Sequence, residues 1–171
     1  MPRTSAQRGF SLVEMIFYVA LLALALYAVT ETLLIMVRSY GSLRSTQRIE
    51  QDAGVALERM LREIRDASAV QDAGSVLGAH PGELLLTTTN ASGTPRTVEF
   101  LLSNGALQLW EDGVLSGSLT GGKTSVTNLI FRKISTTRST GVRVEMTVES
   151  GSGSRLRREN FYGTAVLRDS Y

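Results

Sequence analysis

The fold is decided by residues 8–37, which read RGFSLVEMIFYVALLALALYAVTETLLIMV. Between Phe10 and Val37 only Glu14 and Glu31 carry a charge. As a helix, this apolar stretch would be about 42 Å long at 1.5 Å per residue, and the hydrocarbon core of a bilayer is about 30 Å thick. The sequence therefore predicts a membrane-spanning helix over 10–37.

The two acidic residues of this stretch lie at different depths in the expected membrane span. Glu31 lies near the far end of the span, where its carboxylate can sit in the headgroup layer. Glu14 lies about one turn inside the apolar stretch, where a carboxylate costs roughly 3 kcal/mol on insertion scales. We therefore expect Glu14 to meet a cationic partner.

The net charge of the chain is concentrated before the apolar stretch. Residues 1–9 hold Arg3 and Arg8 and no acid, so they account for the whole formal charge of +2. These arginines favour a cytoplasmic amino terminus, although Arg38, Arg44 and Arg48 weaken the asymmetry. Residues 10–119 are net acidic and residues 120–171 net basic. This distribution gives weak support for nucleic acid as a partner and suggests instead an orientation between neighbouring subunits.

The segment Arg8-Gly9-Phe10-Ser11-Leu12-Val13-Glu14 resembles the processing site of type IV pilins and type II secretion pseudopilins. The resemblance implies that residues 1–9 are a leader and that prepilin peptidase cuts between Gly9 and Phe10. It also implies that Phe10 becomes the N-methylated terminus and that Glu14 acts in assembly. Cleavage creates a positive amine at the head of an apolar helix, which Glu14 of an adjacent subunit can neutralise.

Two other interpretations of the amino terminus remain open. A secretory signal peptide also combines basic and apolar segments, and Ala23-Leu24-Ala25 resembles its cleavage site. An uncleaved single-span anchor is the second alternative. The position of Glu14 inside the apolar region, and the continuation of that region beyond Ala25, favour the prepilin interpretation.

The exported part of the chain, expected over 38–171, begins with a continuation of the helix to about residue 67. Leu57, Met60, Leu61 and Ile64 form an apolar stripe at helical spacing. Gly41 and Gly54 are weak points that either permit bending or are tolerated.

From about residue 74 to 171 the sequence predicts an antiparallel β-sheet, and hence an α+β fold with the helix packed on one sheet face. Asn104-Gly105 predicts a type I′ hairpin, and Asp112-Gly113 marks another turn. The expected strands are Glu83 to Thr88, Thr97 to Leu102, Ala106 to Trp110, Val126 to Arg132, Val142 to Glu149 and Phe161 to Arg168.

This layout resembles that of the minor pilins, particularly J-type minor pseudopilins and W-type minor pilins. The resemblance implies a non-enzymatic filament subunit without a cofactor, which moves from the bacterial cytoplasmic (inner) membrane into a periplasmic or extracellular filament. The implied partners are other pilin-like subunits, prepilin peptidase, the inner-membrane assembly platform and the lipid bilayer. A membrane-anchored adhesin or ligand-binding module is the alternative function.

Several short motifs suggest other chemistry but lack the required context. Gly117 to Thr124 satisfies the P-loop pattern, yet β-prone residues follow it where a helix is needed. His80 is the sole histidine and the chain has no cysteine, so a metal or catalytic centre is not supported. Asn90-Ala91-Ser92 fits a glycosylation site, and Arg155, Arg157 and Arg158 read as a solvated strand edge.

Overall fold

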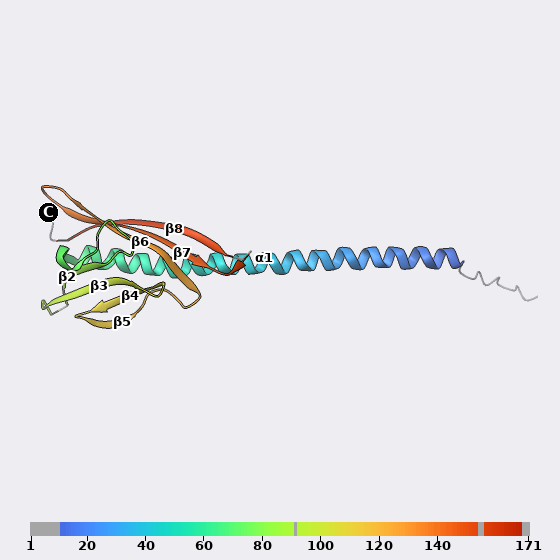
Figure 1. Cartoon of the computed structure of the whole chain (residues 1–171), viewed down its shortest axis with the longest axis horizontal. Helices are drawn as coiled ribbons and strands as arrows, with labels where there is room; N and C mark the ends of the chain where they lie inside the picture. Colours follow the sequence, from blue (N-terminus) through green and yellow to red (C-terminus); the bar gives the residue numbers. More distant parts are fainter. Residues whose placement is uncertain (1–10, 91, 154–155, 169–171) are drawn as a thin grey trace, which may run out of the picture. The chain divides into compact units, whose positions relative to one another are not determined.

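The computed structural model describes residues 11–90, 92–153 and 156–168. These residues form one α-helix, a single-turn 3-10 helix and eight strands (Figure 1). In chain order the elements are α1 (Leu12–Asp66), β1 (Ala67–Val70), the 3-10 helix (Asp72–Gly74), β2 (Leu84–Thr89), β3 (Pro95–Ser103), β4 (Ala106–Glu111), β5 (Val114–Ser118), β6 (Thr124–Ser135), β7 (Thr140–Ser150) and β8 (Arg157–Val166).

The chain divides into two units, Met1–Gly41 and Ser42–Tyr171, and α1 contributes residues to both. In the first unit the side chains from residue 11 to residue 40 are all exposed. Among the described residues α1 is the one helix that is long and apolar enough to cross a membrane, with a mean hydropathy of 2.3 over an 18-residue window.

The second unit contains two antiparallel sheets where the sequence predicted one. Strands β1 to β5 form a five-stranded sheet in chain order, and β6 to β8 form a three-stranded sheet. The sheets separate because the loop before β2 occupies one edge of β6, where Gly78 N donates to Phe131 O at 2.8 Å and Gly82 N donates to Leu129 O at 2.8 Å. An alternating pattern fixes the two faces of a strand but not its neighbour.

The predicted hairpins form at the expected turns. Asn104 and Gly105 both have positive φ, as a type I′ turn requires, and they join β3 to β4. Asp112 and Gly113 have the same conformation and join β4 to β5. Two strands were not predicted: β5, and β1, which begins directly after α1 instead of near residue 74.

One apolar core joins the second-unit part of α1 to both sheets. Figure 1 shows strands of both sheets alongside this part of the helix. Met60 and Ile64 of the predicted stripe are fully buried, and Leu57 and Leu61 pack against the core at its margin. Gly163 of β8 lies so close to the helix that an added Cβ would come within 2.8 Å of Leu61 Cδ1. The α+β class is confirmed, with α1 ending at Asp66.

A network of four charged side chains links α1 to β3 and β4. The buried carboxylate of Glu63 accepts from Arg59 at 2.7 Å and from Arg96 at 3.1 Å. Glu111 accepts from Arg96 at 3.2 Å and from Arg59 at 3.4 Å. The Arg59–Glu63 pair, four residues apart on α1, is thus one side of a larger network, in which two arginines neutralise two carboxylates at the edge of the core.

Candidate functional site

The candidate site is centred on Glu14, in the first turn of α1. Met15 N donates to Ser11 O at 3.1 Å, so hydrogen bonding of the helical kind begins at the first described residue. An acidic side chain so near a helix amino terminus interacts favourably with the helix dipole. The exposed Glu14 side chain accepts a hydrogen bond at Oε1 from the Tyr18 hydroxyl at 3.3 Å.

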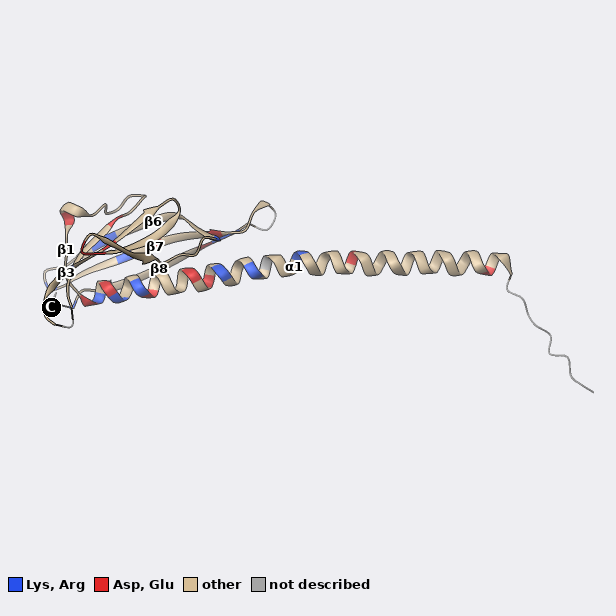
Figure 2. Ribbon diagram, turned by 90° about the horizontal axis from the view of Figure 1, so that it is seen from below, with Lys and Arg blue, Asp and Glu red and all other residues tan. Residues whose placement is uncertain are grey.

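The carboxylate of Glu14 has no cation nearby in the described part of its own chain. The first basic residue after it is Arg38, and 24 residues of helix separate the two by about 36 Å. Figure 2 shows the same pattern, because the first part of α1 is almost free of charge and blue positions begin only well along the helix. A cation for Glu14 must therefore come from residues 1–10 or from another molecule.

The other two residues of the predicted site, Gly9 and Phe10, lie outside the described residues. The cleavage of the Gly9–Phe10 bond and the methylation of Phe10 thus stay predictions from the sequence. Sequence reasoning did not single out Tyr18. Its spacing of four residues from Glu14 was the signal that could have found it, since side chains at i and i+4 are neighbours on a helix.

The P-loop-like segment has a structural role in the second unit. Gly117 and Ser118 belong to β5, and Thr124 begins β6, so a strand stands where a P-loop needs its helix. Asp52 Oδ2 on α1 accepts from Thr124 Oγ1 at 2.6 Å and from Gly121 N at 3.3 Å. The glycine-rich segment is therefore held against α1 by its own polar groups.

The remaining candidates each have a local partner. His80 Nδ1 accepts from Leu129 N at 3.1 Å, which places the histidine in the loop that lies along β6. Asn90 Oδ1 accepts from the amides of Ser92 and Thr94 within a turn. Arg158 lies at the exposed start of β8 and pairs with Glu149 on β7, whereas Arg155 lies outside the described residues.

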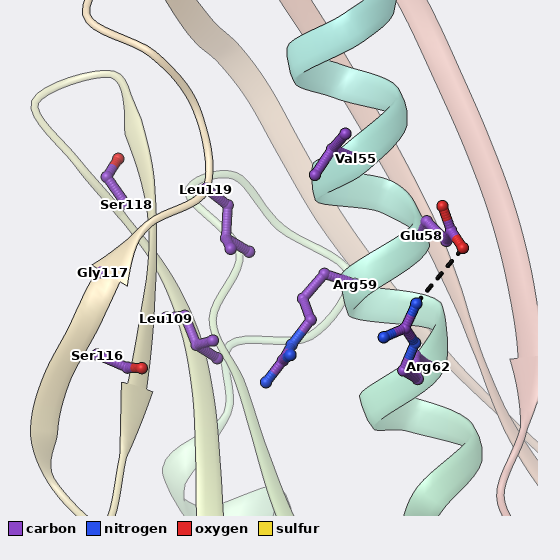
Figure 3. Close-up of a pocket in the computed structure, with 9 residues that line it drawn as sticks. All are labelled: Val55, Glu58, Arg59, Arg62, Leu109, Ser116, Gly117, Ser118 and Leu119. Atoms are coloured by element: carbon purple, nitrogen blue, oxygen red, sulfur yellow. Dashed lines mark hydrogen bonds and ion pairs between the residues drawn. The ribbon is translucent and has the colours of Figure 1, made fainter.

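A groove of about 400 Å³ lies in the second unit between α1 and the edge strand β5 (Figure 3). Its charged side chains are already paired: Arg62 with Glu58 at 3.5 Å, and Arg59 with Glu63 at 2.7 Å. The remaining lining residues are Val55, Leu109, Ser116, Gly117, Ser118 and Leu119. This mixture of apolar, hydroxyl and neutralised groups identifies no ligand class.

Comparison with protein families gives one match, to the prokaryotic N-terminal methylation motif over residues 4–29. The matched segment contains Gly9, Phe10, Glu14 and Tyr18. No curated protein and no solved structure matches the chain.

The match supports a type IV pilin-like protein, of the kind that prepilin peptidase processes. Proteins with this motif are structural rather than enzymatic, and in general they associate with other pilin subunits and with prepilin peptidase. The long helix packed against antiparallel sheets is consistent with the pilin fold, and its apolar first part indicates membrane anchoring.

Proposed function

We propose that this protein is a minor pilin or minor pseudopilin of a type IV pilus or type II secretion pseudopilus. Residues 1–9 serve as a leader, residues 10–37 form the transmembrane half of the helix, and residues 38–171 form the exported head. The amino terminus lies in the cytoplasm before processing. An inner-membrane assembly platform, driven by a separate cytoplasmic ATPase, then lifts the subunit from the bilayer into the filament.

The proposal rests on one observation: an acidic side chain stands in the first turn of α1, at the start of its apolar part and inside the methylation motif. Cleavage after Gly9 would leave the ammonium of Phe10 four residues before Glu14. Two unit charges 4 Å apart attract each other by about 4 kcal/mol at an effective dielectric constant of 20. The contact between the Phe10 ammonium of one subunit and Glu14 of its neighbour would thus offset the cost of placing both charges in an apolar environment.

The exposed apolar surface of α1 favours a partner in another subunit. The apolar side chains of α1 in the first unit are exposed, so they need lipid or other helices to cover them. Helices of several subunits packed together would provide this cover and would bring ammonium and carboxylate groups into the same layer. Filament incorporation and charge neutralisation are therefore one event in this mechanism.

The test is Glu14→Ala, with Glu31→Ala as the matched control in the same apolar stretch. We expect Glu14→Ala to be cleaved normally and to reduce the fraction of subunit in sheared filaments about tenfold or more, which corresponds to a loss of at least about 1.4 kcal/mol. Glu31→Ala should assemble within about twofold of the wild type, because residue 31 can lie in the headgroup layer. Normal incorporation of Glu14→Ala would contradict the charge-pairing mechanism.

A further inference from the structure

We infer that Tyr18 is a positioning residue for Glu14, and that its phenol holds the carboxylate ready for the ammonium of the neighbouring subunit. This inference rests on the proposed function and adds a residue to the assembly site. It starts from the hydrogen bond between the Tyr18 hydroxyl and Glu14 Oε1, at 3.3 Å.

The orientation of side chains on a helix determines from which side Tyr18 approaches Glu14. Side chains on a helix lean toward its amino terminus, so Tyr18 lies over the turn that contains Glu14. Glu14 in turn leans toward the start of the helix, the end at which cleavage would create the ammonium of each subunit. The phenol therefore approaches the carboxylate from the side that faces away from the helix start.

The hydrogen bond from Tyr18 uses only one acceptor position of the Glu14 carboxylate. An ionised carboxylate has two oxygens and about four acceptor positions, and the phenol uses one of them at Oε1. Among the residues that the structure describes no hydrogen bond reaches Oε2, and a methylated ammonium has fewer donors than a carboxylate has acceptor positions. The phenol and the ammonium can thus bind the same carboxylate together, and a charge-assisted hydrogen bond is stronger than a neutral one.

Because the surroundings are apolar, the hydrogen bond between Tyr18 and Glu14 stabilises both side chains before assembly. A hydroxyl without a partner in an apolar medium costs about 1–3 kcal/mol, and an unpaired carboxylate costs more. The first turns of α1 expose apolar side chains such as Val13, Met15 and Phe17. Tyr18 donates to Glu14 from within this apolar surface, so its hydroxyl fixes the carboxylate rotamer while the subunit waits in the bilayer.

The chain offers a matched control for the phenol. Tyr27 lies in the same apolar stretch and is exposed to a similar degree, 66% against 53% for Tyr18. It lies 13 residues after Glu14, about 20 Å along the helix, and cannot reach the carboxylate. Tyr27→Phe removes the same hydroxyl from the same span without touching the proposed contact.

The first measurement is filament incorporation of the full-length protein. Tyr18→Phe should be processed normally and should lower the fraction in sheared filaments about three- to tenfold, whereas Tyr27→Phe should remain within about 1.5-fold of the wild type. Equal incorporation of Tyr18→Phe and Tyr27→Phe would overturn the inference.

The second measurement reads the hydrogen bond itself. Ultraviolet resonance Raman spectra of the processed full-length protein in lipid vesicles report whether a tyrosine hydroxyl donates strongly. The difference spectrum between wild type and Tyr18→Phe should show a strong donor, and the same difference taken in a Glu14→Gln background should show a weaker one. An unchanged difference spectrum would mean that Tyr18 donates elsewhere, and it would overturn the positioning role.

The two measurements also separate this inference from the proposed function. If Glu14→Ala abolishes incorporation while Tyr18→Phe assembles normally, the positioning role is wrong and the charge pairing stands. If Glu14→Ala assembles normally, the charge pairing is wrong, whatever the Raman spectra show about Tyr18.

Discussion

The two units differ in the partners that they provide for an acidic side chain. In the second unit, buried Glu63 meets two arginines of its own chain, at 2.7 and 3.1 Å. In the first unit, Glu14 has only the Tyr18 hydroxyl among the described residues at its site, and the next basic residue is Arg38. The second unit thus supplies cations for this buried carboxylate, whereas the described part of the first unit offers Glu14 no cation.

The same contrast holds for apolar surface. All buried apolar side chains among the described residues lie at Ile49 or beyond, whereas those from residue 11 to residue 40 are exposed. Burial of apolar area is the main source of folding stability, at about 25 cal/mol per Å². We therefore expect the second unit to carry the folding stability and the first unit to carry membrane anchoring and assembly.

The largest expected effect tests this division of stability. Phe100 of β3 is fully buried in the core, so Phe100→Ala should lower the free energy of unfolding by about 3–5 kcal/mol. Leu22→Ala, on the exposed apolar helix, should leave it unchanged. Denaturant unfolding in detergent, followed by the fluorescence of the single Trp110, measures both. A similar loss of unfolding free energy in the two variants would show that both units carry the folding stability.

The next effect tests the network of charged side chains around Glu63. Glu63→Ala leaves two arginines with one carboxylate at the edge of the core, and should cost about 2–3 kcal/mol because the arginines are partly exposed. Glu58→Ala removes an exposed pair on the same helix and should cost about 0.5 kcal/mol or less. Thermal unfolding of the two variants gives the comparison, and a cost for Glu63→Ala no greater than that for Glu58→Ala would argue against the network.

The smallest effect concerns the carboxylates of Glu99 on β3 and of Glu83, which lies just before β2. A hydrogen bond with Glu83, burial and the negative charge of Glu83 together raise the pKa of Glu99 from 4.5 to about 7. Between these pH values Glu99 holds more protons in the folded state than in the unfolded state, so its contribution to stability is largest below pH 4.5 and falls as the pH rises to about 7.

Solvent screening keeps this loss to about 1 kcal/mol. Glu99→Gln should remove the slope, because an amide does not titrate. The measurement is the free energy of unfolding of the wild type and of Glu99→Gln at a series of pH values across this window. If the free energy of unfolding changed with pH in the same way in both proteins, Glu99 would be ruled out as the source of this pH dependence.

The local features of the fold were predictable because short sequence patterns determine them. Asn104-Gly105 supports the positive φ values of a tight hairpin, and the spacing of Met60 and Ile64 sets the buried stripe of α1. The edge strand β5 was missed because its sequence, Val-Leu-Ser-Gly-Ser, does not alternate. Strand β1 was missed because small residues dominate it.

Contacts between distant residues were not predictable from such patterns. Arg96 reaches Glu63 across 33 positions, and no local signal marks this pairing. The separation into two sheets depends on the loop that lies along β6, which the strand patterns do not encode. At the candidate site the prediction identified Glu14 from its unusual surroundings, but it missed Tyr18, which is unremarkable until its contact is seen.

The proposed assembly requires that a newly formed Phe10 ammonium meets Glu14 of another subunit. Amino-terminal mass spectrometry of membrane-extracted protein tests whether that ammonium forms. We predict a mature chain that begins with N-methylated Phe10, and a Gly9→Leu variant that retains residues 1–9. A chain that begins after Ala25, or an uncleaved chain, would remove the ammonium from the site and contradict the mechanism.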